Sequence, residues 1–242
     1  MSSSAKLNLP VRQVRKPNKR KAGRRQGRPP ASEKGIGRQR LVDAARMLLL
    51  TLPPAKLTSS QVAAAAGADR GLVRYYFGTM PELLAEVARQ LSRDLVVSLG
   101  SASTGPGTAS KRLRRRIREF VRYELANPAL HPLYTEQILS GKARAAAETI
   151  KNTAAVGHAS FREIIELGRR SGEFRGDFDI RLLDIAIIGL CEFIVVGRPI
   201  LEGWIAGEED IASLLARYGD FVADLVIDGI IRKKRKEPAR PS

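Results

Sequence analysis

The sequence has few of the residues that mark common classes of protein. Its 242 residues include one cysteine, Cys191, and two histidines, His131 and His158. A single cysteine excludes an intramolecular disulfide framework and a cysteine-based zinc site. No nucleophile or carboxylate motif surrounds the histidines, and no pair has the spacing of metal ligands. We therefore expect no catalytic residues, no metal site and no cofactor, and we do not expect an enzyme.

Long hydrophobic runs are also missing. The most apolar run is residues 185–196 (IAIIGLCEFIVV), which includes Glu192. It is well short of the roughly 20 apolar residues that span a bilayer, and the N-terminal residues contain no apolar core of a signal peptide. The sequence predicts a soluble, cytoplasmic protein in which Cys191 is a buried, inert thiol.

The excess of positive charge lies at the two ends. The net charge is +17, and residues 1–40 carry 13 Lys and Arg against one acid, while residues 232–242 carry six against one. The remaining residues are neutral overall. Such like-charged segments cannot bury apolar surface, so residues 1–33 and 232–242 are predicted to be a disordered arm and tail. Basic ends indicate a polyanionic partner, most commonly nucleic acid.

The arm contains RRQGRPP at residues 24–30. Arg28 between glycine and proline resembles the AT-hook, which lies in a narrow, A·T-rich minor groove. Gln26 stands where that motif has its first arginine. Two interpretations are therefore open: a hook that uses Arg25 and Arg28, or an arm that binds phosphates without sequence preference.

Between the ends, the hydrophobic spacing is helical throughout and predicts an all-α fold. Pro53 and Pro54 end the first helix, and the small residues at 100–110 predict a loop. The segment 179–201 is apolar nearly all round and should be buried on more than one side. About nine helices are predicted, over residues 34–52, 58–65, 69–76, 79–99, 111–126, 131–140, 142–170, 179–201 and 208–231.

The second and third helices form a helix-turn-helix pattern. Thr58 and Gln61 make a capping box, Gly67 suits a left-handed C-terminal position, and Asp69 can cap the third helix. Arg70 and Arg74 are four residues apart and so lie on one face of that helix. The second helix of this motif enters the major groove of DNA, where arginine can bind guanine at two points.

The stretch 58–84 resembles the N-terminal DNA-binding segment of the tetracycline-repressor (TetR) family of bacterial regulators. The match comprises Thr58, Val62-Ala63, residues 66–71 (AGADRG), Tyr76-Phe77 and residues 82–84 (ELL). Three positions depart from the family pattern: Arg74 replaces a tyrosine, Leu72 a small polar residue and Met80 a lysine. The DNA-contacting residues predicted from the pattern and the resemblance are Lys56, Thr58, Arg70, Gly71, Leu72, Arg74, Tyr75 and Tyr76.

The resemblance implies a three-helix DNA-binding domain at residues 34–80 and a helical ligand-binding and dimerisation domain at 81–231. Aromatic residues of the second domain are the candidate ligand contacts: Phe120, Tyr123, Tyr134, Phe161, Phe193 and Trp204. The family dimerises through its last two long helices, and the candidate interface residues are Ile187, Leu190, Ile194, Leu214, Tyr218, Phe221 and Leu225. The basic run 111–122 is expected to be a solvated helix face, with DNA or an acidic ligand as the alternative.

Together these features predict a homodimeric, ligand-responsive transcriptional regulator. A repressor is favoured over an activator. It should bind a near-palindromic operator in double-stranded DNA and leave it when a small molecule binds. The alternative is an architectural DNA-binding protein that acts mainly through its basic arms, with the helical body serving only to dimerise.

Overall fold

The structure is a computed structural model that describes residues 31–139, 144–204 and 210–232, and the side chains of residues 37–136, 147–204 and 210–232. Arg25, Arg28 and almost all of the predicted arm and tail lie outside the described residues. Within the described residues the fold is all-α, as predicted, with ten α-helices, one short 3₁₀ helix and no strand longer than an isolated bridge.

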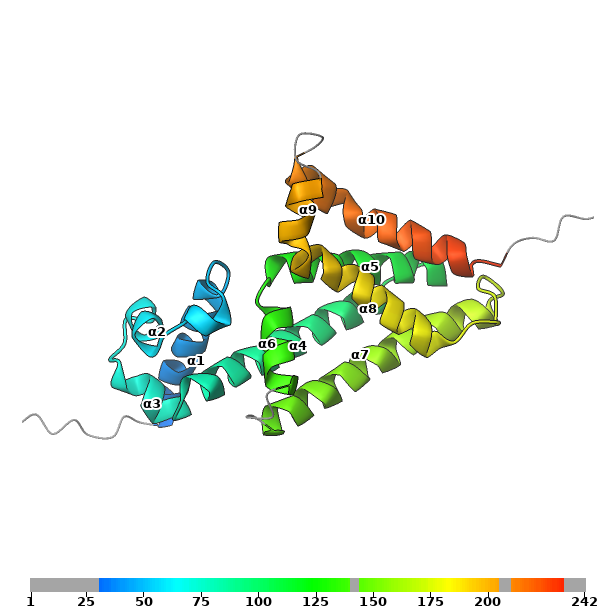
Figure 1. The fold of residues 1–242 in the computed structure, drawn as a ribbon. Helices are drawn as coiled ribbons and strands as arrows, with labels where there is room; N and C mark the ends of the chain where they lie inside the picture. Colours follow the sequence, from blue (N-terminus) through cyan, green and yellow to red (C-terminus); the bar gives the residue numbers. More distant parts are fainter. Residues whose placement is uncertain (1–30, 140–143, 205–209, 233–242) are drawn as a thin grey trace, which may run out of the picture.

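A small head contains the first helices (Figure 1). It consists of α1 (Ala31–Leu48), the 3₁₀ helix (Pro54–Lys56), α2 (Ser59–Ala65) and α3 (Gly71–Phe77). Pro54 begins the 3₁₀ helix after a turn, so the two prolines separate α1 from α2 as predicted. Leu41, Val62 and Val73 are almost fully buried at the centre of the head, one from each α-helix.

The long helix α4 (Met80–Thr104) leaves the head and runs into the body. Its first half, with Leu83 and Val87, packs in the head's hydrophobic cluster, and Leu99 near its end packs in a second cluster in the body. One rigid helix is therefore part of both cores.

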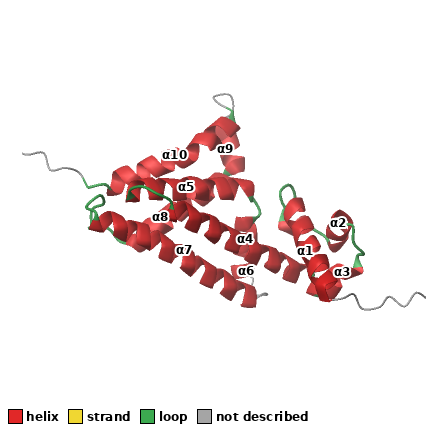
Figure 2. Cartoon of the chain, turned by 180° about the vertical axis from the view of Figure 1, so that it is seen from behind, coloured by secondary structure: helices red, strands yellow, loops and turns green. Residues whose placement is uncertain are grey.

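The body contains the remaining helices, seen from behind in Figure 2. They are α5 (Ala109–Ala126), α6 (Leu130–Leu139), α7 (Arg144–Arg170), α8 (Ile180–Val196), α9 (Arg198–Trp204) and α10 (Ile211–Ile230). Helix α4 packs against α5 and α7, and α5 packs in turn against α8 and α10. Cys191 is fully buried in this core, as predicted.

Three predicted boundaries are wrong. Helix α1 ends at Leu48 and not at Leu52, and a turn leads from there to the two prolines. Helix α4 continues through residues 100–104, which were expected to be a loop, because Ser103 bonds back to the carbonyl of Leu99 and Arg116 donates to the Ser103 hydroxyl. The segment 179–201 is split into α8 and α9. Pro199 cannot donate to an interior helical hydrogen bond, so it starts a new helix.

Candidate DNA-binding surface and ligand cavity

The turn between α2 and α3 is fixed by local hydrogen bonds. The hydroxyl of Thr58 accepts from the backbone N–H of Gln61, and the Gln61 side chain accepts from the N–H of Thr58 at 2.9 Å. Gly67 has a φ of +60°, a left-handed conformation that favours glycine. The Asp69 carboxylate accepts from the N–H of Gly71 at 2.7 Å. The predicted capping box and glycine turn are confirmed. The N-cap residue of α3 is Arg70 and not, as predicted, Asp69, which instead accepts from Gly71 one residue before that cap.

Helix α3 presents one face to solvent and the other to the core of the head. Val73 is 2% exposed, whereas Arg70, Arg74 and Tyr75 are exposed. The two arginines contribute to a shallow hollow that also includes Ser59 at the start of α2. Lys56 and Thr58 are exposed just before α2. The structure therefore brings the arginines of α3 and the start of α2 to one surface.

Two other residues predicted to contact DNA, Leu72 and Tyr76, pack against other parts of the head. Leu72 is half-buried against the core of the head. The Tyr76 ring packs edge-on against Tyr75, with ring centroids 4.9 Å apart, and its hydroxyl lies so close to Gly37 of α1 that a Cβ there would be 2.9 Å away. Tyr76 thus fixes α3 against α1 while Tyr75 stays exposed.

A buried carboxylate holds the head to α4. The Oε2 atom of Glu86 on α4 forms a salt bridge with the guanidinium of Arg38 on α1 at 3.1 Å. It also pairs with Arg89 of its own helix. Burial alone would raise the pKa of Glu86, but the hydrogen bonds from Arg89, Arg38 and Gln90 lower it to about 2. Sequence reasoning missed this cluster, because Arg38 and Glu86 are 48 positions apart.

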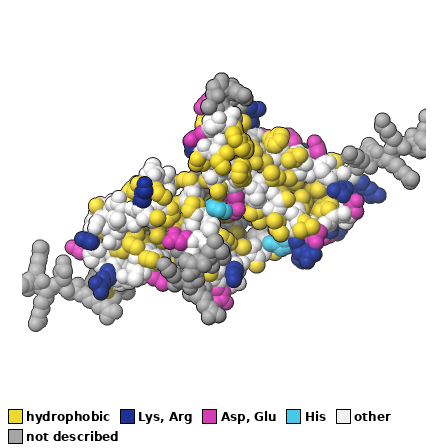
Figure 3. All heavy atoms as spheres, in the orientation of Figure 1, with side chains coloured by type: hydrophobic (Ala, Val, Ile, Leu, Met, Phe, Trp, Pro, Cys, Tyr) yellow, Lys and Arg dark blue, Asp and Glu magenta, His cyan; other side chains and the backbone are white. Residues whose placement is uncertain are grey.

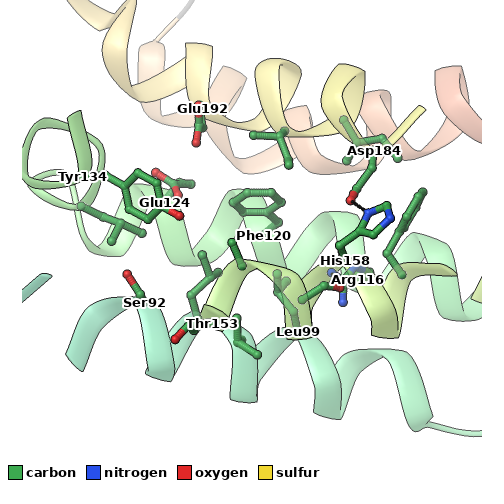
Figure 4. Close-up of a pocket in the computed structure, with 18 of the residues that line it drawn as sticks. Ser92, Leu99, Arg116, Phe120, Glu124, Tyr134, Thr153, His158, Asp184 and Glu192 are labelled. Carbon is green, nitrogen blue, oxygen red and sulfur yellow. Dashed lines mark hydrogen bonds and ion pairs between the residues drawn. The ribbon is translucent and has the colours of Figure 1, made fainter. Parts of the chain in front are cut away.

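The body encloses a cavity of about 220 Å³ between α4, α5, α6, α7 and α8 (Figure 4). Most of its lining is apolar. The apolar lining residues are Leu95, Val96, Leu99, Leu113, Ile117, Phe120, Leu130, Ile150, Ala154, Phe161, Ile187 and Ile188, and the polar ones are Ser92, Arg116, Glu124, His131, Tyr134, Thr153, Gly157, His158, Asp184 and Glu192.

Three of the six aromatic residues predicted to contact a ligand line this cavity: Phe120, Tyr134 and Phe161. The Tyr123 side chain points elsewhere, and its hydroxyl donates to the carbonyl of Leu91 at 2.8 Å. Phe193 and Trp204 are exposed on the outside of the body. Both histidines line the cavity, although their sequence context did not predict it, since one lies on α6 and the other on α7.

The polar groups at one end of the cavity satisfy each other. His158 lies 2.6 Å from a carboxylate oxygen of Asp184. Arg116 donates to the hydroxyls of Ser103 and Ser160 at 3.0 Å and to the carbonyl of Gly157 at 2.8 Å. Burial lowers the pKa of Arg116, and the nearby Asp184 opposes that shift.

The other end holds two glutamates. The Nδ1 atom of His131 lies 3.4 Å from a carboxylate oxygen of Glu192. Burial raises the pKa of Glu192, an effect that His131 reduces. Glu124 is only 2% exposed, and its Oε2 atom has no hydrogen-bond partner within the described part of the chain. Burial and the charge of Glu192 raise the pKa of Glu124 to about 8.

The comparisons with known proteins agree with this architecture. Residues 41–87 match the family of bacterial regulatory proteins called tetR, and residues 110–226 match the tetracyclin repressor-like C-terminal domain. The chain belongs to the TetR family. It is therefore a transcriptional regulator with a helix-turn-helix head rather than an enzyme.

Individual relatives of the TetR family are distant. The HTH-type transcriptional repressor NicS of Pseudomonas putida is 25% identical over 182 residues, which cover 71% of this chain and 82% of NicS. Two solved structures share the fold. FadR of Bacillus subtilis, in complex with stearoyl-CoA, has a TM-score of 0.58 at 18% identity and covers 79% of this chain and 98% of its own. KstR2 of Mycobacterium tuberculosis has a TM-score of 0.60 at 16% identity. The match covers 81% of this chain and 95% of the KstR2 chain.

The basic run of α5 makes contacts within the protein. Arg114 and Arg118 pair with Asp224 and Asp220 on α10, and Arg116 is buried beside the cavity. Arg115 donates to the carbonyl of Ala102 near the end of α4 and to that of Pro106 in the loop that follows. The expectation of a solvated face is therefore wrong for Arg116, which is buried, whereas Arg118 is exposed and pairs at the surface.

A hydrophobic face covers the outside of α8, α9 and α10 (Figure 3). Its exposed members are Leu182, Ile185, Phe193, Val196, Ile200, Trp204, Phe221 and Leu225. Among the predicted interface residues, Phe221 and Leu225 belong to this face, while Leu190, Leu214 and Tyr218 are half-buried. Ile187 and Ile194 are buried inside the protomer, so neither can face a partner.

Two further observations concern the described residues only. None of their helices has the length and apolar content needed to cross a bilayer. No three of their His, Cys, Asp or Glu side chains gather closely enough to hold a metal ion.

Proposed function

We propose that this regulator is a homodimeric repressor that places α3 of each subunit in a major groove of a near-palindromic operator. The observation that carries this proposal is the two-sided character of α3. Its core face anchors the helix through Val73, and its exposed face offers Arg70, Arg74 and Tyr75. Arginine can contact guanine at two points, and a tyrosine hydroxyl can fix the register on a phosphate. The similarity to the repressor NicS supports repression.

Dimerisation uses the hydrophobic face of α8–α10. Large exposed apolar patches on soluble proteins mark interaction surfaces, and a two-fold dimer buries the same patch on both subunits. On α8 the interface consists of Leu182, Ile185, Phe193 and Val196, which lie about 130° around the helix from the positions predicted from sequence. Phe221 and Leu225 supply the contribution of α10.

The cavity in the body is the site of the effector. Four of its lining residues, Ser92, Leu95, Val96 and Leu99, belong to α4. The same helix enters the core of the head and is held to α1 through Glu86 and Arg38. A ligand that changes the position of α4 therefore moves α3 and alters the spacing of the two α3 helices in the dimer. By linkage, DNA must weaken ligand binding by the same factor.

Selection of bound fragments from random double-stranded DNA tests the proposal. The full chain is used at ~150 mM salt, where non-specific phosphate binding is weak. We expect a palindrome whose half-sites are separated by about one helical turn. Recovery of A·T-rich DNA without symmetry would instead show that the basic arm dominates, as in an architectural protein, and would overturn the proposal.

A further inference from the structure

The unpartnered carboxyl group of Glu124 points to the chemical class of the ligand. This side chain comes from the last turn of α5 and lines the cavity close to Tyr134 (Figure 4). Glu124 is 2% exposed, and its Oε2 atom has no hydrogen-bond partner among the side chains that the structure describes. A buried carboxylate without a partner is strongly destabilising. A group that enters the cavity and donates to Oε2 would remove that cost.

No cation in the described lining is free to neutralise Glu124. Arg116 already donates to three oxygen atoms and lies with Asp184 and His158 at the opposite end of the cavity (Figure 4). His131 is next to the second acid, Glu192. The described lining thus contains three carboxyl groups and one obligate cation, and that cation is already paired at the far end of the cavity.

The neighbouring groups narrow the choice of ligand further. A carboxylate ligand has no hydrogen to donate to Oε2 and would bring a further acid next to Glu124 and Glu192. A neutral hydroxyl could donate a hydrogen bond, but it would bring no charge to balance the acids. Between the two polar ends, Phe120, Ile187 and Leu99 form an apolar wall that suits a hydrocarbon body.

We propose that the effector is a small amphipathic organic amine, whose ammonium group donates to Glu124 beside Glu192 while its apolar body lies along the middle of the cavity. This assignment rests on the proposed function, since it identifies the effector of the same cavity. A volume of about 220 Å³ has room for on the order of seven water-sized groups. The raised pKa of Glu124 agrees with the assignment, because a proton occupies the empty site where the ammonium group would bind.

Three probes with the same six-carbon body separate the possible head groups: hexylammonium, 1-hexanol and hexanoate. Their affinities for the full-length protein are measured by titration calorimetry. We expect hexylammonium to bind at least about tenfold more tightly than 1-hexanol, the range of one charge-assisted hydrogen bond, and hexanoate to bind most weakly. Tighter binding of hexanoate than of hexylammonium would overturn the assignment, as would the absence of any dissociation constant below about 1 mM.

Substitutions locate the binding group. Glu124→Gln should lower the affinity for hexylammonium about tenfold or more, and should change the affinity for 1-hexanol by less than about threefold. The matched control is Glu119→Gln on the same helix, because the Glu119 carboxyl pairs with Arg122 outside the cavity. An unchanged amine affinity in Glu124→Gln would overturn the proposal. If that variant does not fold, Glu192→Gln serves in its place and should weaken amine binding relative to the wild type.

A DNA-release assay separates this inference from the proposed function. The selected operator is labelled, and its release is followed by fluorescence anisotropy as each probe is added. Amine binding without release would overturn the effector mechanism and leave the amine assignment intact. Release by hexanoate and not by hexylammonium would support the effector mechanism and overturn the amine assignment.

Discussion

The head and the body each contain a buried glutamate, and the pKa values of the two are shifted in opposite directions. Glu86, where the head meets α4, is surrounded by arginines, and its pKa is lowered to about 2. Glu124 in the body has no arginine partner among the described residues, and burial and the charge of Glu192 raise its pKa to about 8. A paired carboxylate holds helices together, whereas an unpaired one beside a cavity is available to a ligand.

The same contrast holds for the residues that face solvent. The head directs arginines and a tyrosine outward on α3, as a protein that binds a large polyanion requires. The body directs a few polar groups into its cavity and leaves an apolar face exposed on α8, α9 and α10, which suits a small ligand and a second subunit. Five experiments test this division, in order of decreasing expected effect.

Removal of both arginines from α3 should abolish specific DNA binding and leave the body unaffected. Each specific base contact is worth about 1–3 kcal/mol at one half-site. The variant Arg70→Ala/Arg74→Ala should therefore lose at least about 10³-fold in operator affinity over two half-sites, as measured by anisotropy. Lys151→Ala, an exposed position on α7, is the control. Retention of operator affinity within tenfold would contradict the role of α3.

A charge on the outer face of α10 should separate the subunits without unfolding them. Phe221 is 63% exposed, so Phe221→Glu does not disturb the core of the protomer, but it would bury a charge in a dimer. We expect sedimentation to show monomers at concentrations where the wild type is dimeric. Ala216→Glu, an exposed position about 140° away around the same helix, should stay dimeric. Dimeric Phe221→Glu would show that the interface lies elsewhere.

Loss of the Glu86 carboxylate should weaken the attachment of α1 to α4. Glu86→Gln leaves Arg38 and Arg89 without their partner, at a cost of about 1–3 kcal/mol in unfolding free energy near pH 7. Because the folded pKa of Glu86 lies below its ordinary value of 4.5, the wild-type advantage should persist above pH 4.5 and disappear as the pH falls toward 2. Denaturant unfolding at several pH values measures this change. The exposed Glu82→Gln variant should show no such advantage.

Glu124 should give the opposite dependence on pH. Its folded pKa of about 8 exceeds the ordinary 4.5, so the folded state holds an extra proton between these values. Stability should therefore fall as the pH rises from 4.5 to 8, with a contribution of up to about 1.4 kcal/mol per pH unit from this group. Glu124→Gln should remove that contribution. An identical pH profile in the variant and the wild type would mean that Glu124 is ionised in the folded protein.

The smallest effect is expected at the start of α2. Thr58→Ala removes the hydroxyl that accepts from the N–H of Gln61, and loss of such a cap costs about 1 kcal/mol. Thr58→Ser keeps the hydroxyl, so its unfolding free energy should stay within a few tenths of a kcal/mol of the wild type. Unfolding free energies of the two variants provide the comparison, and equal losses would show that the methyl group matters more than the cap.

The head could be predicted almost completely from the sequence, because its features are local. The capping box of Thr58, the left-handed Gly67 and the hydrogen bond that Asp69 accepts each depend on residues within a few positions of one another. The prolines before α2 act through their own backbone restrictions. The four-residue spacing of Arg70 and Arg74 was sufficient to place both on one face of α3.

The body required the tertiary structure, because its site is assembled from five helices. The spacing along α8 could not show which of its apolar positions face α5 and which face outward, since the segment is apolar on nearly every side. For the same reason Ile187 and Ile194 were assigned to the wrong face. The sequence by itself determined the family, the fold class and the helix proposed to bind DNA, which follow from short-range hydrogen bonding and helical periodicity. The pairing of Glu86 and the isolation of Glu124 were decided only by packing, because the charges that shift a pKa come from helices far apart in the sequence.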